Sequence, residues 1–407
     1  MNIKKKKIGD IATIIDGDRG NNYPKQNEFS PSGYCLFLNA GNVTANGFVF
    51  DDNSYITQEK DALLRKGRLS RGDIVYTTRG TIGNVAYYSN TIPYEHLRIN
   101  SGMVILRVNV VEANAAFLYQ YLKSAKVREY FLSFKTGSAQ PQLPIKNFSA
   151  IEIDLPDLPT QRRIASILSA YDDLIENNRR QIKLLEEAAQ RLYREWFVEL
   201  RFPGHEGVKV VDGVPEWWTV TTASEVTNVL RRGISPNYDE TARLSVISQK
   251  CIRQYMVDMN QVRRQSKSFD SSMGLLDSDT VICSTGTGTL GRVGKVFGNH
   301  PNCTFDSHVT LVRTNGTVGK HYLNLRMYEL REYFDSCKTG STNQTELSHS
   351  IVQNVKVYIA DSHTQKIFEK IEEAYHQKMM ICQHQIQLLT ETRDRLLPKL
   401  MNGEMEV

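Results

Sequence analysis

The sequence predicts an α+β protein built by tandem duplication, with one α+β domain and one long helix in each half. Two stretches show sustained helical periodicity, one near the middle of the chain and one at its end. The regions before them show short β-type runs separated by turn residues. The two helical stretches also match each other at a constant offset of 204 residues in a chain of 407. We therefore expect domains at 1–157 and 203–360 and helices at 158–202 and 361–407.

The repeat is clearest in the helical stretches. The matching positions are Thr160-Gln161 with Thr364-Gln365, Ile167 with Ile371, Ile182–Leu185 with Ile386–Leu389, and Arg191-Leu192 with Arg395-Leu396. No Gly or Pro interrupts the first stretch between Thr160 and Phe202, so we expect Thr160 to cap the helix and Pro203-Gly204 to end it. At ~1.5 Å per residue, about 40 residues form a rod of roughly 60 Å.

The apolar side of these helices predicts that they pair as a coiled coil within the chain. Apolar residues recur at three- and four-residue steps over about five heptads, and a seam of that length needs a partner of similar length. The positions assigned to this seam and to the binding of partner proteins are Ile164, Ile167, Tyr171, Leu174, Asn178, Leu185, Leu192, Ile371, Leu388 and Leu396. Asn178 is polar, and a polar residue on a seam fixes register at a cost in stability. The alternative is that each helix simply packs on a globular core.

The two domains show the same order of elements. In the first domain the expected strands are 34–39, 73–77, 85–88, 103–108 and 150–155, with one helix at 113–131. In the second domain the expected strands are 245–248, 280–283, 293–297, 308–313 and 354–360, with one helix at 321–334. Apart from a few landmarks the domains differ freely in sequence. Two different surfaces on two similar supports indicate two different recognition tasks.

Two loops are the shared landmarks. GDIVYTTRGTIGNVAYY at 72–88 aligns with SDTVICSTGTGTLGRVGKV at 278–296, and KTGS occurs at 135–138 and again at 338–341. The second glycine-rich loop satisfies G-x-G-x-x-G, but a strand-like run follows where a dinucleotide site needs a helix, so we interpret it as a β-turn. The K-T-G of penicillin-recognising enzymes also requires S-x-x-K and S-D-N, which this chain lacks.

Cationic and amide side chains gather on these loops. Lysine and exposed backbone amides suit phosphate, while Gln and Asn suit the edges of adenine. The residues predicted to contact DNA are Arg79, Thr81, Lys135, Ser138, Gln140, Gln142, Thr287, Arg292, Lys338, Ser341, Asn343 and Gln344. The alternative is that both loops are structural turns with glycine at positive φ.

Composition is compatible with nucleic-acid binding without requiring it. The chain has 50 Lys and Arg against 45 Asp and Glu, a net charge of +5 and a pI of about 8.7, which is a mild basic excess. Its six cysteines form no C-x-x-C pair, as expected of reduced, buried thiols. No segment is long enough to span a membrane. We expect a cytoplasmic protein.

The sequence contains no catalytic or metal-binding constellation. Cys303, Asp306 and His308 lie close together, and so do His376, Cys382 and His384, but neither set has zinc-site spacing. There is no G-x-S-x-G, no carboxylate cluster of a nuclease, and no N-P-P-Y or D-P-P-Y of an amino-methyltransferase. We predict a non-catalytic chain that holds no metal and no cofactor.

Two variable α+β domains, each followed by a long helix, closely resemble the specificity subunit of Type I restriction–modification enzymes. The resemblance covers the whole chain and is strongest in LPTQRRIASILSAYDDLIENNRRQIKLLEEAAQRLYREWF and RDRLLPKLMNGEMEV. The two KTGS loops and the VPEWW that opens the second domain add to it. The first domain departs from the pattern because it begins with KKKKIGDIATI and lacks P-E-x-W.

In that family each domain is a target-recognition domain that binds one half of a split, asymmetric site on double-stranded DNA. The resemblance implies that the helices pair antiparallel, set the unread spacer and help to dock two methyltransferase subunits, whose core can recruit motor and nuclease subunits. One copy of this chain per complex would supply sequence choice. S-adenosylmethionine, ATP and magnesium would be used by the partner subunits.

Two other classes of function are weighed against this one. A coiled-coil interaction scaffold that does not bind DNA would lack the steep loss of DNA binding that a DNA reader shows as salt rises. A stand-alone methyltransferase or nuclease is disfavoured by the missing motifs, and we expect the purified chain to transfer no methyl group alone.

Overall fold

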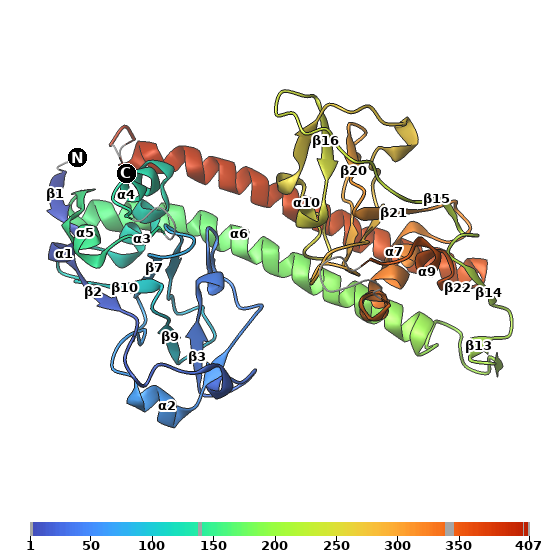
Figure 1. Ribbon diagram of the computed structural model, residues 1–407, viewed down its shortest axis with the longest axis horizontal. Coiled ribbons are helices and arrows are strands. Elements are labelled where there is room, and N and C mark those ends of the chain that lie inside the picture. The colour runs from blue at the N-terminus through green and yellow to red at the C-terminus, as the bar shows by residue number, and fades with distance from the viewer. Residues whose placement is uncertain (1–2, 137–140, 338–345, 402, 406–407) are drawn as a thin grey trace. The chain divides into compact units, whose positions relative to one another are not determined.

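The computed structural model describes residues 3–136, 141–337, 346–401 and 403–405, and it divides into two compact units (Figure 1). Unit 1 comprises Met1–Glu176 and Gln387–Val407, and unit 2 comprises Asn177–Ile386. Each unit contains one α+β domain and a segment of both long helices, α6 (Leu158–Tyr193) and α10 (Ser362–Met401). The α+β class predicted from the sequence is confirmed.

The main sheet of unit 1 has four antiparallel strands, in the order β2 (Ala12–Asp16), β10 (Met103–Val108), β7 (Ile74–Thr77) and β8 (Val85–Tyr87). A smaller sheet has the order β6 (Tyr55–Ile56), β3 (Cys35–Leu38) and β9 (Leu97–Ile99), with β3 and β9 parallel. Strands β7 and β3 are buried along their whole length, which explains why their sequences are mostly apolar runs and do not alternate.

Unit 2 repeats this strand order. Its main sheet runs β15 (Thr227–Arg232), β21 (Val309–Thr314), β18 (Thr280–Cys283) and β19 (Val293–Lys295). Its smaller sheet runs β17 (Arg263–Gln265), β16 (Leu244–Ile247) and β20 (Cys303–Phe305), with β16 and β20 parallel. The two domains therefore share one architecture although their sequences match at few positions.

A two-stranded sheet leads each domain into its long helix. In unit 1, β1 (Lys4–Lys7) pairs with β11 (Glu152–Leu155), and in unit 2, β14 (Thr219–Thr222) pairs with β22 (Lys356–Ile359). The chain passes directly from β11 into α6 and from β22 into α10. The first and last strands of each domain are thus held together at the root of the helix that follows.

The single helices expected at 113–131 and 321–334 are wrong, because each is two helices. The helices of the domains are α3 (Ala115–Lys123), α4 (Ala125–Leu132), α5 (Ile145–Ala150), α7 (Lys320–Glu329), α8 (Arg331–Ser336) and α9 (His349–Gln353). Ser124 breaks the first pair, since its backbone is extended and its hydroxyl accepts the N–H of Val127 at 3.3 Å. Apolar periodicity continues across this cap, so the pattern alone does not show the break.

The other elements are short. They are α1 (Ile8–Ile11), α2 (Gln58–Leu63), β4 (Val43–Thr44), β5 (Gly47–Phe48), β12 (Val210–Val211) and β13 (Val214–Pro215), with 3-10 turns at Gln26–Glu28, Ala40–Asn42, Gln249–Cys251, Met259–Gln261 and Ser271–Met273. The hairpin β4–β5 and helix α2 lie in unit 1, and at the corresponding place in unit 2 the chain forms 3-10 turns.

The long helices begin close to their predicted starts, but the residue that caps the first one is different. Helix α6 begins at Leu158, where Asp157 accepts the N–H of Thr160 at 2.9 Å, so the cap is Asp157 and not Thr160. Asp361 does the same before α10, accepting the N–H groups of His363 and Thr364. Helix α6 continues as a π-helical turn, Arg194–Val198, and ends before the predicted stop at Pro203-Gly204.

In both units the segments of α6 and α10 pack together (Figure 1). In unit 1, early α6 residues such as Leu168 share a core with late α10 residues such as Leu400, and Arg393 donates to Asp172 at 2.6 Å. In unit 2, late α6 meets early α10, where the rings of Trp196 and Phe368 lie 5.6 Å apart. The helices therefore run antiparallel.

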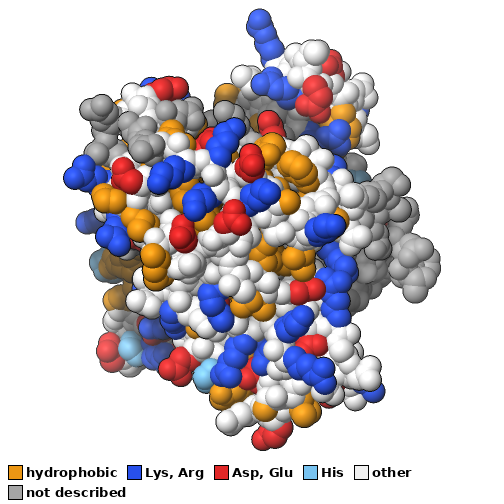
Figure 2. Space-filling model, turned by 90° about the vertical axis from the view of Figure 1, so that its left-hand side faces the viewer, with side chains coloured by type: hydrophobic (Ala, Val, Ile, Leu, Met, Phe, Trp, Pro, Cys, Tyr) orange, Lys and Arg blue, Asp and Glu red, His pale blue; other side chains and the backbone are white. Residues whose placement is uncertain are grey.

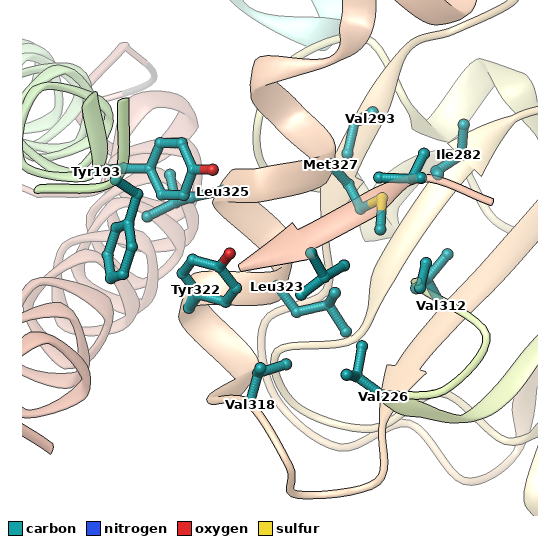
Figure 3. Close-up of a cluster of buried hydrophobic side chains, with 14 of the residues drawn as sticks. Tyr193, Val226, Ile282, Val293, Val312, Val318, Tyr322, Leu323, Leu325 and Met327 are labelled. Carbon is teal, nitrogen blue, oxygen red and sulfur yellow. The ribbon is translucent and has the colours of Figure 1, made fainter. Parts of the chain in front are cut away.

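Both helices also contribute to the core of the adjoining domain. Figure 3 shows Tyr193 of α6 beside Tyr322 of α7, with ring centroids 5.8 Å apart. In unit 1, Ile164 and Leu168 belong to the same buried cluster as Phe117 of α3. The buried side of each helix is therefore wider than a coiled-coil seam, because it faces a domain as well as the other helix.

This wider buried side explains where the seam prediction is wrong. Of the positions assigned to the seam, Ile164 and Asn178 are buried, and Tyr171, Leu185, Leu192, Ile371 and Leu396 are partly buried. Ile167, Leu174 and Leu388 are 37%, 51% and 49% exposed, so these three are not in the seam. Leu168 and Ile175 are buried in their place on α6. Among the described residues, no helix is long and apolar enough to cross a membrane.

Candidate nucleic-acid interface

In each domain the glycine-rich loop lies against the chain that leaves the KTGS loop. We call residues 78–84 and 284–292 the glycine loops. In unit 1, Leu143 donates its N–H to the carbonyl of Thr78 at 2.9 Å, and Arg79 forms an isolated β-bridge with Gln142. Gln142 is also bridged to Thr136 by two backbone hydrogen bonds, of 2.8 and 2.9 Å. Two loops far apart in the sequence thus form one surface.

Unit 2 makes the same contacts. Leu347 donates its N–H to the carbonyl of Ser284 at 2.8 Å, and Thr285 is bridged to Glu346. A third segment contacts the glycine loop in both units. The backbone N–H of Thr78 donates to the carbonyl of Gly102 at 2.9 Å, and that of Ser284 donates to the carbonyl of His308 at 2.8 Å. We call this meeting of three segments the loop junction. Its backbone is equivalent in the two units.

An ion pair with a buried carboxylate lies at the start of the strand that leads into each glycine loop. Arg107 donates to Asp73 at 2.8 Å in unit 1, and Arg313 donates to Asp279 at 2.6 Å in unit 2. Both carboxylates are 2% exposed and stand one residue before the strand that carries the glycine loop. Burial raises the pKa of Asp279, and the hydrogen bond from Arg313 opposes that rise.

The sequence analysis missed these two ion pairs, although the sequence contains a signal for them. Asp73 and Asp279 occupy the same place in the aligned GDIV and SDTV segments, and Arg107 and Arg313 have the same offset of 206 residues. Because both carboxylates are buried, loss of either arginine would leave a carboxylate poorly solvated.

The glycine loops turn tightly on glycines in left-handed conformation. Gly80 and Gly83 have φ of 69° and 95°, and Gly286, Gly288 and Gly291 have φ of 96°, 77° and 80°. Strand β19 follows the second loop directly, so the G-x-G-x-x-G there is a β-turn, as the sequence analysis interpreted it. This geometry agrees with the structural-turn alternative and is also compatible with a loop that presents side chains to a ligand.

The described candidate residues do not all point into solvent. Arg79, Thr81, Lys135, Gln142 and Thr287 are exposed. Arg292 is partly buried and donates to the carbonyl of Gly288 at 2.6 Å, so its guanidinium closes its own loop. Six other candidates lie outside the described residues: Ser138, Gln140, Lys338, Ser341, Asn343 and Gln344.

The side chains at the loop junction differ between the units. In unit 2 the hydroxyl of Thr285 lies 2.7 Å from Nδ1 of His308 and accepts from Gln249 at 2.9 Å. In unit 1 the residues at the places of Thr285 and His308 are Arg79 and Gly102. The two units therefore present different chemistry on one backbone. Figure 2 shows Lys and Arg side chains spread over one face of the molecule, with acidic and hydrophobic side chains between them.

The residues weighed as metal ligands have other partners. Nδ1 of His308 bonds to Thr285, His376 donates through Nε2 to Asp277 at 2.9 Å, and the thiol of Cys382 lies 3.8 Å from the side-chain oxygen of Gln181. Within the described part of the chain, no group of three or more His, Cys, Asp or Glu could hold a metal ion.

Comparisons with known proteins agree on one family. Residues 1–187 match the family described as the Type I restriction modification DNA specificity domain. The chain is 27% identical over 349 residues to the Type I restriction enzyme MjaIX specificity subunit of Methanocaldococcus jannaschii, covering 83% of this chain and 78% of that protein. It is 22% identical to the HindI specificity subunit of Haemophilus influenzae, covering 96% and 98%.

A solved structure shows the same fold. The crystal structure of the Type I restriction–modification S subunit from M. genitalium superimposes with a TM-score of 0.57 at 16% identity, covering 98% of this chain and 96% of that one. The domain match, the full-length relatives and the shared fold point the same way. The chain belongs to the family of Type I restriction–modification specificity subunits, the non-catalytic subunits that give these enzymes their DNA specificity.

Proposed function

We propose that each domain reads one half of a bipartite, asymmetric site on double-stranded DNA, and that α6 and α10 set the distance between the halves. The observation that carries this is the loop junction, whose backbone is the same in both units while its side chains differ. A backbone arrangement that occurs in both domains with different side chains suits the binding of two half-sites of different sequence. The proposed domains are 1–157 and 203–360, and the proposed spacer helices are 158–202 and 361–407.

The loops shared by both domains would contact the DNA backbone. Lys135, Arg79 and Thr81 are exposed on one surface of unit 1, and cations and hydroxyls of this kind bind phosphate oxygens. Gln142, Thr287 and Arg292, together with Ser138, Gln140, Lys338, Ser341, Asn343 and Gln344, complete the proposed set. Phosphate contacts position a protein without specifying sequence, so the cationic and hydroxyl residues of this set would supply affinity common to all sites. The Gln and Asn residues of the set would contact the edges of adenine.

The helices would also dock two methyltransferase subunits. Leu184 of α6 and Leu388 of α10 occupy equivalent repeat positions and are 55% and 49% exposed. Exposed apolar residues mark protein contacts when they form a patch, so these two matched leucines are the positions that we propose as centres of contact. Two matched positions on one chain suit two copies of one partner. Ile167 and Leu174, at 37% and 51% exposure, extend this apolar surface in unit 1.

Native mass spectrometry of the co-expressed complex tests the docking proposal. Leu388→Asp should remove one of the two methyltransferase subunits, because a carboxylate cannot be buried in an apolar contact without a large cost. The double variant with Leu184→Asp should remove both. Glu187→Asp, an exposed change on α6, serves as the control. Retention of both subunits by the double variant would contradict the proposal.

Partner chemistry completes the proposal. The methyltransferase subunits would use S-adenosylmethionine, and motor and nuclease subunits recruited to the same core would use ATP and magnesium. This chain would be present once per complex and would supply sequence choice.

Domain exchange tests the recognition proposal. Residues 203–360 are replaced by the corresponding domain of another specificity subunit, and methylated bases in the host genome are mapped by sequencing. We expect one half-site to change while the other half-site and the spacer stay the same. An unchanged methylation motif would show that this domain does not read DNA sequence.

A further inference from the structure

The two domains differ in charge along the outer strand of the smaller sheet. Strand β6 pairs with β3 and strand β17 pairs with β16, and both pairings are antiparallel. Ile56 lies opposite the first residue of β3, and Gln265 lies opposite the first residue of β16, so β6 and β17 occupy equivalent places. A difference here is therefore a difference in side chains on a common frame.

In unit 1 this place is apolar and closed. Ile56 of β6 is buried in a cluster with Phe37, and the rings of Phe29 and Tyr23 lie 5.5 and 5.6 Å from that of Phe37. Ser30 is bridged to Tyr55, which brings Phe29 beside the strand. Aromatic rings thus cover the outer strand of unit 1.

In unit 2 the same place is cationic and open. Arg263 and Arg264 of β17 are exposed, and so is Lys267 just beyond the strand. Arg264 donates to the carbonyl of Ala242 at 2.8 Å, and Lys267 donates to the carbonyl of Ser235 at 3.2 Å. Arg263 differs from both. Among the residues that the structure describes, its guanidinium has no recorded hydrogen bond or ion pair.

Arg263 is nevertheless held in place. Its guanidinium carbon lies 3.4 Å from the centre of the Tyr238 ring, and Tyr238 is bridged to Gln265 on the same strand. Tyr238 is itself 44% exposed, so the stacked pair faces solvent and supports no core. A guanidinium fixed by stacking, with its donors free, loses less entropy on binding a planar acceptor than a mobile one.

We propose that Arg263, stacked on Tyr238, reads a guanine in the half-site bound by the second domain. This inference rests on the proposed function, in which that domain binds one half-site. The planar fork of arginine matches the O6 and N7 acceptors of guanine in the major groove, which is wide enough to admit paired β-strands. Among the described residues the Arg263–Tyr238 pair occurs only in the second domain, so it would add to the difference that the side chains of the loop junction already make between the domains.

Position along the sheet supports this assignment. Arg263 lies opposite Val246, near the end of β16 from which the chain enters the turn that carries Gln249. Gln249 donates to Thr285 of the glycine loop at 2.9 Å. A phosphate contact at the loop junction and a base contact from β17 would thus come from neighbouring parts of one domain.

Methylation mapping of point variants tests the proposal. Arg263→Lys keeps the charge but loses the fork, so the complex should lose discrimination at one base pair of one half-site. Methylation of sites substituted at that base pair, relative to methylation of the original site, should rise about 5- to 150-fold, the range expected for one lost bidentate contact. Tyr238→Leu should have a smaller effect at the same base pair, because the guanidinium remains but is no longer fixed.

Arg264→Lys is the matched control, since its neighbouring position on β17 points to the opposite face of the strand. Its methylation motif should be unchanged. If Arg263→Lys leaves the motif unchanged while exchange of residues 203–360 replaces the half-site, the Arg263 assignment is wrong and the proposed function stands. If neither change alters the motif, the proposed function itself is wrong. Urea unfolding of each variant confirms that the domain is folded.

Discussion

The two units join their domain to the long helices by opposite chemistry. In unit 1 the contact is apolar, with Phe117, Ala165 and Leu168 at 0%, 4% and 0% exposure. The residues 204 positions later are His321, Glu369 and Glu372, and the first and last of these are 0% and 1% exposed. Apolar side chains pack at both junctions, but at these three matched positions unit 1 has apolar residues and unit 2 has charged or polar ones.

The network in unit 2 centres on Lys295, which is fully buried. Lys295 donates to Nδ1 of His321 at 2.7 Å, and Nε2 of His321 donates to Glu373 at 2.9 Å. This pair of bonds requires a neutral imidazole. Burial, followed by the charge of Lys295, lowers the pKa of His321 to about 3.

The network is incompletely paired. Both carboxylate oxygens of Glu372 are buried and have no hydrogen-bond partner among the described residues. Burial raises the pKa of Glu372 to about 7 and lowers that of Lys295 to about 8, and the attraction between the two groups opposes both shifts. A buried charged pair of this kind adds little net stability, yet loss of one member is costly. The two halves of the chain thus share their backbone architecture but differ in the side-chain interactions that stabilise it.

Asp172 in unit 1 has more hydrogen-bond partners than Glu372 has in unit 2. Asp172 accepts from Gln120 at 2.6 Å, from Lys123 at 3.0 Å and from Arg393 at 2.6 Å. Asp172 corresponds to His376 in the repeat, and Gln120 corresponds to Asn324. Burial raises the pKa of Asp172, but its partners outweigh this and hold it below the usual value.

The largest expected effect is that of Lys295→Met, which leaves Glu372 buried without a cation. We expect unit 2 to lose about 3–5 kcal/mol of unfolding free energy. Urea unfolding followed by tryptophan fluorescence measures this in unit 2 alone, because Trp196, Trp217 and Trp218 all lie in it. Adding Glu372→Leu should restore most of the loss, since apolar side chains can replace two opposite charges that are buried near each other. A single variant as stable as the wild type would contradict the account.

The apolar junction of unit 1 should respond as an ordinary core does. Leu168→Ala removes a fully buried side chain, so we expect a loss of about 2–5 kcal/mol from the transfer and cavity costs. Hydrogen exchange of α3 and β11 amides measures opening of unit 1. Replacing Leu168 by a charged residue should also destabilise unit 1, and no second substitution in this apolar site should restore the lost stability. Protection equal to the wild type in Leu168→Ala would show that the site is not a packed core.

Acid should weaken unit 2 through His321. Its pKa is lowered from 6.5 to about 3 in the folded state, so its contribution to stability is fully present above pH 6.5 and is lost as pH falls towards 3. Between pH 6 and 5, the wild type should therefore lose about 1.4 kcal/mol per pH unit more than His321→Gln. Phe117→Leu in unit 1 is the control and should leave this slope unchanged. Parallel slopes for wild type and His321→Gln would refute the assignment of a neutral buried histidine.

The smallest effect is expected on the surface. Arg194, in the π-helical turn that follows α6, pairs with Glu329 of α7 at 3.0 Å, but Arg194 is 59% exposed, and the equivalent repeat position in unit 1 is Pro398. An exposed pair contributes about 0–1 kcal/mol, so Arg194→Ala should barely change tryptophan-detected unfolding. A loss of several kcal/mol would mean that the units differ on their surfaces as well as at the buried junction.

The duplication, several strands of each domain and the two long helices could be predicted from sequence because each leaves a local pattern, but the order of the strands in the sheets could not. Buried strands such as Ile74–Thr77 are mostly apolar runs, and the helices show apolar residues at three- and four-residue steps. The split at Ser124 could not be predicted, since apolar spacing continues across it. The seam was predicted only in part, because apolar residues at Ile167 and Leu174 fit the same period as buried ones.

The candidate site could be predicted less completely. The glycine loops and the KTGS loops are visible as repeated segments, but their contact through Thr78 and Leu143 depends on the fold. Lysine and glutamate in a sequence indicate surface, so nothing local shows that Lys295 and Glu372 are buried together. An arginine in a polar segment such as that around Arg263 indicates surface, and only its stacking on Tyr238 sets it apart.

The most direct test of the central claim places the second domain on the first support. Residues 1–157 are replaced by 203–360 in two versions, one with α6 unchanged and one with Ala165→Glu, Leu168→Glu, Ser169→Glu and Asp172→His. Methylated bases are then mapped in the host. If each domain needs the buried side chains of its own helix, only the second version should methylate DNA. If each domain reads its own half-site, the methylated motif should carry the second domain's half-site at both ends. Equal activity of the two versions would contradict the matched junction, and survival of the original half-site would contradict half-site reading.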